Sequence, residues 1–312
     1  MSRTAYYWDA ISLEHDTGRH VEQIARAERL RPEAMRAQVP ELDARAVVDH
    51  DAPRWIVRVH ESAYHDWVAE ACRRGKSLLD GGDTVVSERS YEAALGSVNA
   101  ALTAADAVMT GQADNAFCAM RPPGHHALPH AAMGFCLFGN VAIVARYLQE
   151  HHKIGRIAIV DFDVHHGNGT QDIFYRDGDV LFVSLHQHPL WPGSGMADEI
   201  GEGPGKGMTL NIPIAPFTSE SEYLATFEAR VLPAVLSFKP EFLLVSAGFD
   251  AHRDDPLANL QLTETGFGQL TRWLKQLAGD RCQGHIISCL EGGYNLDALQ
   301  RSVAAHVLAL ME

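Results

Sequence analysis

The chain has 312 residues, of which 46% are hydrophobic and 21% charged, a balance typical of a folded globular protein rather than a disordered one. Its 40 Asp and Glu residues outnumber its 26 Lys and Arg residues, so the formal net charge is −14. This excludes a general nucleic-acid-binding protein, because phosphate contacts need clustered basic side chains, and it favours cationic partners. The five cysteines have no Cys-x-x-Cys spacing, so we expect neither a disulfide framework nor a thiolate zinc site.

The sequence shows no targeting or membrane segment. Residues 1–14 lack the apolar run of a signal peptide, and every long apolar stretch is interrupted by polar residues. We therefore expect a cytoplasmic protein with no membrane partner. No linker rich in Pro, Gly or Ser divides the chain, and the glycine-rich stretch 193–207 is interpreted as a surface loop. We expect one domain over residues 1–312.

Short apolar runs alternate with helix-like stretches along the chain. Helices are predicted at 91–109, 141–150, 220–238 and 264–278, and buried strands at 116–120, 156–160, 180–185, 209–214, 241–246 and 285–290. Strands without polar alternation, separated by helices, indicate an α/β fold whose mostly parallel sheet is covered on both faces. Periodicity leaves open whether this sheet is doubly wound or closed into a barrel.

Unusual polar segments follow four of the predicted strands. They read RPPGHH at 121–126, DFDVHHGNG at 161–169, AGFD at 247–250 and EGGY at 291–294. Ligands of parallel α/β proteins bind at the carboxyl ends of the strands. These segments are therefore expected to converge on one crevice.

Three residues of these segments form a plausible metal-binding set. Asp163, His165 and Asp250 offer one nitrogen and two carboxylate oxygens, which leaves a position open for water or substrate, as catalytic zinc requires. Two carboxylates after an apolar strand repel each other unless a cation lies nearby, which favours a metal site over simple turn residues.

The remaining polar residues supply acid–base chemistry. His125 and His126 are suited to proton transfer near neutral pH, and Asp161 and Asn168 are candidates to bond their far nitrogens. Tyr294 can donate its hydroxyl to a developing oxyanion. A metal, a base and an oxyanion donor are the parts needed to hydrolyse an amide or ester.

Several features also have simpler interpretations. The pair at 151–152, also two histidines, lies at a helix end and is interpreted as capping or solvated. The glycines at 292–293 can be a turn device only, and Phe135 and Trp191 are core aromatics by default. DAHRD at 250–254 matches a pattern of binuclear manganese ureohydrolases, so a polynuclear metal hydrolase stays an alternative. We interpret Asp250 as a ligand, and His252 and Asp254 as supporting or loop residues.

The ordered motifs closely resemble the histone deacetylase superfamily, which includes bacterial acetylpolyamine amidohydrolases and acetoin-utilisation proteins. They are RPPGHHA at 121–127, DFDVHHGNG at 161–169, VSLH at 183–186, PGSG at 192–195, SAGFD at 246–250 and EGGY at 291–294. The resemblance covers roughly residues 10–310. Asn168 and the LEGGY sequence at 290–294 look like the class II branch. The resemblance implies a single arginase-like α/β/α domain of three layers.

The resemblance also implies roles for the residues of the motifs. Zinc would be bound by Asp163, His165 and Asp250. His126 would act as general base and then acid with His125 as its electrostatic partner, Asp161 would pair with His125 and Asn168 with His126. Tyr294 would polarise the acyl carbonyl.

Further implied roles concern the substrate tunnel and a second ion. Phe135 and Trp191 would line a tunnel for an aliphatic amine, with Gly134 and Gly293 contributing backbone. Trp191 departs from the usual Phe. A structural monovalent cation, expected to be potassium, would contact Asp161, Asp163, His165, Ser184 and Leu185.

The resulting hypothesis is a zinc-dependent deacetylase that hydrolyses an N-acyl amine, most simply acetyl-lysine of proteins or a related small acylated amine. An acetylpolyamine deacetylase is the alternative, and a non-catalytic acyl-amine sensor would be expected to lose Tyr294 or a histidine of the pair. Acidic residues of the N-terminal segment, Glu14, Asp16 and Glu22, are expected to reach the rim and favour cationic substrates. The oligomeric state stays open.

Overall fold

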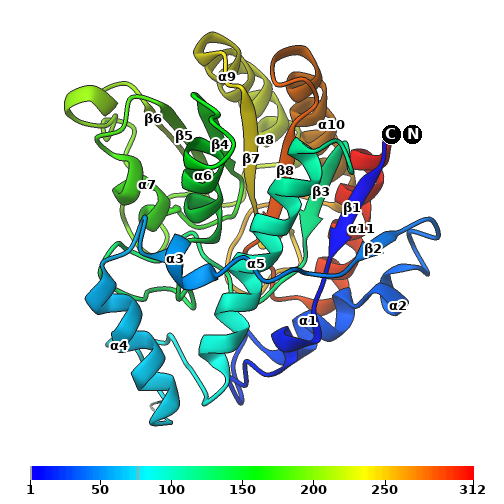
Figure 1. Cartoon of the computed structure of the whole chain (residues 1–312). Helices are drawn as coiled ribbons and strands as arrows, with labels where there is room; N and C mark the ends of the chain where they lie inside the picture. Colours follow the sequence, from blue (N-terminus) through cyan, green and yellow to red (C-terminus); the bar gives the residue numbers. More distant parts are fainter. Residues whose placement is uncertain (1, 76) are drawn as a thin grey trace.

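The computed structural model describes residues 2–75 and 77–312 and contains one eight-stranded sheet with the strand order β2-β1-β3-β8-β7-β4-β5-β6 (Figure 1). Every ladder between these strands is parallel. The strands are β1 (Thr4–Tyr7), β2 (Asp43–Arg45), β3 (Asn115–Cys118), β4 (Ile157–Asp161), β5 (Val180–Gln187), β6 (Thr209–Ile214), β7 (Phe242–Ala247) and β8 (Ile286–Leu290).

The inner strands are buried on both faces, which explains their continuous apolar sequences. In β7, Phe242 and Leu244 belong to the core on one side of the sheet, whereas Leu243 and Val245 belong to the core on the other. Successive side chains of a strand point to opposite faces of the sheet. When both faces are covered, every position is buried, and polar residues do not alternate with apolar ones.

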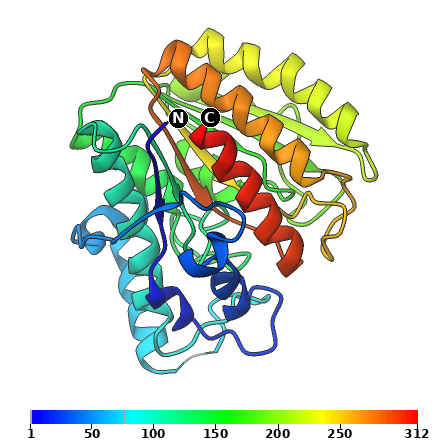
Figure 2. The same cartoon turned by 90° about the vertical axis from the view of Figure 1, so that its right-hand side faces the viewer.

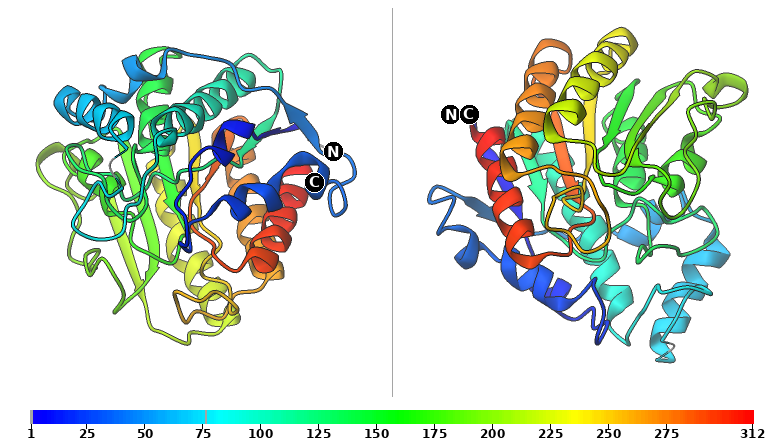
Figure 3. Two further views of the ribbon diagram at one scale, coloured as in Figure 1. Left: turned by 90° about the horizontal axis from the view of Figure 1, so that it is seen from below. Right: turned by 180° about the vertical axis from the view of Figure 1, so that it is seen from behind.

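Helices cover both faces, giving three layers (Figures 2 and 3). One layer contains α3 (Ala52–Ile56), α4 (Ser62–Arg73), α5 (Ser90–Met109), α6 (Asn140–Glu150) and α7 (Asn168–Phe174). The other contains α1 (Ile24–Leu30), α2 (Pro32–Met35), α8 (Glu220–Thr226), α9 (Leu232–Phe238), α10 (Glu264–Arg281) and α11 (Leu296–Met311). A π-helical turn, Phe227–Val231, joins α8 to α9, and short 3₁₀ turns lie at Ala10–Leu13 and Gly203–Gly205.

The predicted α/β architecture is confirmed: it is a single α/β domain, and its sheet is open rather than a closed barrel. The six predicted strands and four predicted helices are present within a few residues of their expected bounds. The strands β1 and β2 and the helices α1, α2, α3, α4, α7 and α11 were not predicted from the sequence. Of the helices in residues 2–75 and 77–312, none has both the length and the apolar character needed to cross a membrane.

Candidate active site

The four polar segments do converge at the carboxyl edge of the sheet. They follow β3, β4, β7 and β8, the four central neighbours in the strand order. Figure 3 (left) shows the molecule from below, the side toward which the strands run in Figure 1. At the end of β4, Asp161 lies in register between Ser184 of β5 and Ser246 of β7. The parallel register therefore brings segments that are far apart in the sequence into one site.

Asp163, His165 and Asp250 form a buried group whose ligand atoms all lie within 4.8 Å of one another. Nδ1 of His165 is 3.1 Å from Oδ1 of Asp163 and 3.1 Å from Oδ2 of Asp250. Backbone N–H groups hold the carboxylates: Val164 donates to Asp250 over 2.9 Å and Gly292 donates to Asp163 over 2.8 Å. The three side chains are thus fixed around one point.

This group fits a divalent metal ion. Two carboxylate oxygens face one imidazole nitrogen, which can give a hydrogen to only one of them, whereas a cation can bind all three. One nitrogen and two oxygens form a donor set suited to zinc with an open position. The backbone at Gly292 also passes so close to the carboxylate of Asp250 that a Cβ there would lie 2.1 Å from its Oδ2 atom. The Gly292–Gly293 pair is therefore more than a turn device.

The two neighbouring histidines have different partners. Nδ1 of His125 lies 2.9 Å from Oδ2 of Asp161, and Nδ1 of His126 lies 2.7 Å from Oδ1 of Asn168. The centroids of the two imidazole rings are 3.9 Å apart. The structure thus brings together the partners that were expected for each ring.

The electrostatic surroundings make the two rings unequal. Burial disfavours a charge on His125, but Asp163 and Asp161 outweigh it and raise its pKa well above the ordinary value. Burial, together with the charges of His125 and His165, lowers the pKa of His126 well below its ordinary value. These surroundings favour the charged form of His125 and the neutral form of His126.

Tyr294 lies on the loop after β8 and lines the same pocket as His126. Its backbone N–H donates to Oδ2 of Asp255 over 2.7 Å, and the guanidinium of Arg26 lies 5.0 Å from its ring centroid. Burial raises the pKa of Tyr294 well above its ordinary value, so its hydroxyl remains a proton donor.

A pocket of about 430 Å³ opens over these groups. Phe135 and Trp191 line its wall. The ring centroid of Phe135 lies 5.8 Å from that of Tyr294, and the ring centroid of Trp191 lies 4.8 Å from that of His126. Trp191 is 46% exposed, so its default interpretation as a core residue is wrong. Gly134 has φ +57°, and a Cβ there would lie 2.5 Å from Cδ2 of His126. Any other residue at this position would clash with the His126 ring, so this part of the pocket wall requires glycine.

The residues expected around a monovalent cation also come together. Asp161 is fully buried and lies in register beside Ser184, which Leu185 follows on β5. Burial raises the pKa of Asp161 to about 6, although His125 opposes the rise. His252 and Asp254 lie elsewhere: Nδ1 of His252 is 3.7 Å from the carboxylate of Asp254, and neither belongs to the metal-binding group.

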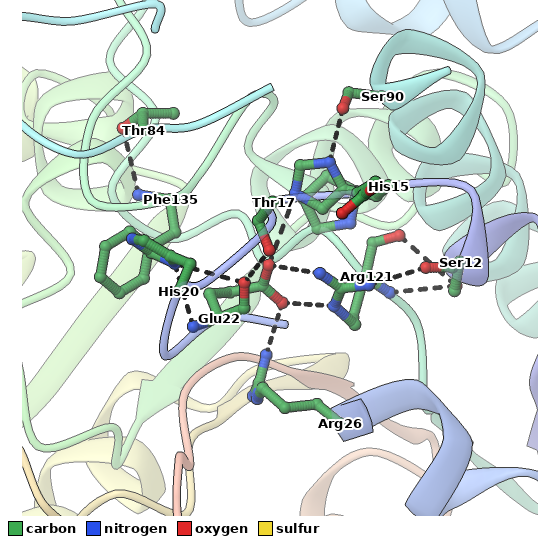
Figure 4. A network of polar contacts seen from close by, with 12 residues as sticks. Ser12, His15, Thr17, His20, Glu22, Arg26, Thr84, Ser90, Arg121 and Phe135 are labelled. Atoms are coloured by element: carbon green, nitrogen blue, oxygen red, sulfur yellow. Dashed lines mark hydrogen bonds and ion pairs between the residues drawn. The ribbon is translucent and has the colours of Figure 1, made fainter. Parts of the chain in front are cut away.

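The expectation that three N-terminal carboxylates reach the rim is wrong. Glu22 is fully buried, because it bonds both Arg121 and Arg26 (Figure 4). Glu14 and Asp16 are exposed but do not line the pocket. The polar side chains that line the pocket near its opening are instead those of Arg19, His20 and Asp83.

The sequence did not reveal three side chains that hold the loops of the site by hydrogen bonds to their backbone: Arg26, Asp255 and Glu291. Arg26 donates to the carbonyl oxygens of Gly293 over 2.7 Å and Glu291 over 2.5 Å. Asp255 anchors Tyr294, and Oε2 of Glu291 accepts from the N–H of Gly124 over 2.7 Å. Asp255 follows the 250–254 segment and Glu291 begins the EGGY motif, but nothing in the sequence marks Arg26, whose two partners are 265 and 267 residues away.

Comparison with known proteins gives a consistent result. The model of the histone deacetylase domain matches residues 20–310. Histone deacetylase 14, chloroplastic, of Arabidopsis thaliana is 42% identical over 266 residues, which cover 82% of this chain and 63% of that protein. Histone deacetylase 10, chloroplastic, of Oryza sativa is 41% identical over 259 residues, covering 80% of this chain and 58% of that protein. The chain therefore spans less than two thirds of these plant relatives.

A bacterial relative matches more of its own length. The histone deacetylase-like amidohydrolase of Pseudomonas aeruginosa is 37% identical over 318 residues, which cover 94% of this chain and 82% of that protein. The crystal structure of the HDA15 HD domain superposes with a TM-score of 0.92 at 34% identity and covers 100% of this chain and 89% of that one. The fold, the convergence of the motifs and these similarities agree, and the chain belongs to the histone deacetylase family.

Proposed function

We propose that this protein is a zinc-dependent deacetylase that hydrolyses an acylated aliphatic amine to the free amine and a carboxylate. The observation that carries the proposal is the buried group of Asp163, His165 and Asp250 beside a charged and a neutral histidine at the base of a pocket. When bound by this group, a zinc ion supplies Lewis acidity that polarises the acyl carbonyl and lowers the pKa of water.

His126 is the proposed general base. Because the amide oxygen of Asn168 accepts a hydrogen bond, Nδ1 of His126 carries the hydrogen and Nε2 is left as the acceptor. Nε2 takes the proton of the attacking water and later delivers it to the leaving nitrogen. His125 stays protonated beside Asp161 and stabilises the negative charge that develops nearby.

Tyr294 is the proposed oxyanion donor. Its hydroxyl is kept protonated, and the loop that carries it is held by Asp255 and Arg26. A donor that is fixed before the reaction stabilises the developing charge without reorganisation. A sensor would be expected to lose at least one of Tyr294, His125 and His126, and all three are present, which supports catalysis over a non-catalytic binding role.

We propose that the pocket accepts the acetylated aliphatic stem of acetyl-lysine, with Phe135 and Trp191 against the methylene groups and Gly134 and Gly293 providing backbone contacts. The support is the aromatic wall leading to His126. Potassium, bound near Asp161 and Ser184, is proposed to hold the ends of β4 and β5. Competing kinetics on an acetyl-lysine peptide and acetylputrescine decide between the lysine and polyamine substrates.

The central experiment compares Asp250→Asn with Asp254→Asn. Both carboxylates lie in the same loop, but only Asp250 belongs to the buried group, and Asp254 is exposed. We expect Asp250→Asn to bind one equivalent of zinc less than wild type and to lose hydrolysis of an acetyl-lysine reporter, and Asp254→Asn to match wild type in both. Equal zinc content and activity in the two variants would overturn the assignment.

A further inference from the structure

A second cluster of metal-binding side chains lies away from the catalytic pocket. It contains Asp106 near the end of α5, His151 and His152 directly after α6, and His50 in the segment before α3. These helix ends precede β3 and β4, so the cluster lies toward the amino edge of the sheet, opposite the catalytic loops (Figure 1).

The cluster is centred on the carboxylate of Asp106. Nε2 of His152 lies 2.7 Å from Oδ1 of Asp106, and the hydroxyl of Tyr147 donates to the same oxygen over 2.6 Å. Nδ1 of His50 lies 3.7 Å from the other oxygen, Oδ2. Asp106, His151 and His152 each offer a ligand atom, and these atoms lie within 4.8 Å of one another.

The imidazole rings are held in place by the ring of Tyr147, which is 3% exposed. His151 stacks on it with centroids 4.9 Å apart and an interplanar angle of 13°, and His152 meets it edge-on at 5.4 Å. His50 approaches it edge-on at 6.0 Å. Rings fixed in this way lose little further freedom when they bind a ligand.

One imidazole nitrogen of the cluster lacks a partner. Nε2 of His50 is buried and makes no hydrogen bond to any of the described residues. The backbone N–H of His50 donates to Oδ1 of Asn99 over 3.0 Å, which fixes the backbone at this residue. A buried nitrogen without a hydrogen bond is costly. Because Nδ1 of His50 is the nitrogen that faces Asp106, His50 lies beside the three ligands Asp106, His151 and His152 and is not one of them.

We propose that Asp106, His151 and His152 bind a divalent late transition metal ion such as Zn²⁺, with His50 beside them as a further imidazole. Imidazole nitrogens with one carboxylate suit zinc, nickel or copper, whereas calcium and magnesium prefer oxygen ligands. The ion would link α5 to the turn between α6 and β4 and would stabilise the fold. This explains the histidine pair at 151–152 better than simple capping does, because a side-chain nitrogen of His152 points to a carboxylate.

The first test counts zinc. The protein is dialysed against zinc at a concentration no higher than its own, and bound metal is measured for wild type, for His151→Gln with His152→Gln, and for His130→Gln. His151 and His130 are both exposed, but His130 lies outside the cluster. We expect the double variant to bind one equivalent less than wild type and His130→Gln to match wild type. Equal zinc content in all three proteins would overturn the proposal.

A second test separates this site from the catalytic one. In the Asp250→Asn background, added zinc should raise the midpoint of thermal unfolding when the cluster is intact and should not do so in the double histidine variant. Circular dichroism in a chelator confirms that all variants are folded. Because the comparison is made without the catalytic ligand, it succeeds or fails independently of the deacetylase assignment. A zinc-dependent shift of equal size in both proteins would contradict the second site.

Discussion

The Nδ1 atom of His126 lies 2.7 Å from the amide oxygen of Asn168. A neutral amide fixes the tautomer of the ring without adding a negative charge, unlike the carboxylate of Asp161 that faces His125. This difference favours the charged form of His125 and the neutral form of His126, although their ring centroids are only 3.9 Å apart.

The first prediction concerns this amide. Asn168→Asp should raise the pKa of His126, because a carboxylate favours the charged imidazole. A base must be unprotonated to act, so the acidic limb of the kcat/KM profile should move to higher pH. The profile is measured on an acetyl-lysine reporter between acid and neutral pH. An acidic limb that stays in place would show that His126 is not the base that limits the reaction.

The second prediction concerns the hydroxyl of Tyr294. Tyr294→Phe keeps the ring beside Phe135 and the Arg26 guanidinium but removes the donor, so turnover should fall by roughly 10²–10³. Tyr91→Phe is the matched control, since its hydroxyl bonds His65 away from the pocket. Steady-state turnover of the two variants is compared with wild type. Normal turnover in Tyr294→Phe would remove the hydroxyl from the reaction.

The parts of the fold that the sequence predicted are those with strong local patterns. The strand β4 is apolar up to its last residue, Asp161, because both its faces are covered, and the polar run that begins there could be assigned to the carboxyl edge. In contrast, β2 has three residues, two of them charged, which gives no apolar run. The strand β1 was missed although it is as long as β3, which was predicted. The helix α11 had a readable start, since the side chain of Asn295 accepts from the N–H of Ala298, but it was not recognised.

The same distinction applies to the site. Asp163 and His165 are two residues apart in one motif, so the sequence alone suggested a shared role. The role of Glu22 depends on two arginines, one of them 99 residues away, and a single sequence carries no sign of that pairing. Its charge was therefore assigned to the rim, although it is buried. Long-range pairing of charges is decided by the tertiary structure.

The third prediction tests this buried ion cluster. Glu22→Gln leaves the guanidinium groups of Arg121 and Arg26 without their carboxylate, and breaking a buried pair costs about 3–5 kcal/mol of unfolding free energy. Glu202→Gln is the control, because its pair with Arg176 is exposed and its loss should be far smaller. Urea unfolding at neutral pH measures both. A loss in Glu22→Gln no larger than that of the control would contradict the role of the cluster.

The last prediction concerns pH and a histidine that the mechanism does not use. His60 is 3% exposed; its Nδ1–H donates to the carbonyl of Leu128 over 2.9 Å, and its Nε2 accepts from the N–H of Gly139 over 2.9 Å. Both nitrogens are occupied in the neutral tautomer, and burial lowers the pKa of His60 from 6.5 to about 4.

Between pH 6.5 and about 4, the unfolded chain binds a proton at His60 that the folded chain does not bind. The free energy of unfolding should therefore fall as the pH drops from 6.5 to about 4, by about 3 kcal/mol from this residue, and the loss should level off below that. His60→Gln should be less stable at neutral pH but should show a flatter decline over this range, whereas the exposed His130→Gln should follow wild type. Urea unfolding at several pH values measures the slopes. Other buried histidines also contribute to the dependence of the unfolding free energy on pH in wild type. The difference in slope between the two variants therefore isolates His60. Parallel slopes would show that the titration of His60 is not linked to folding.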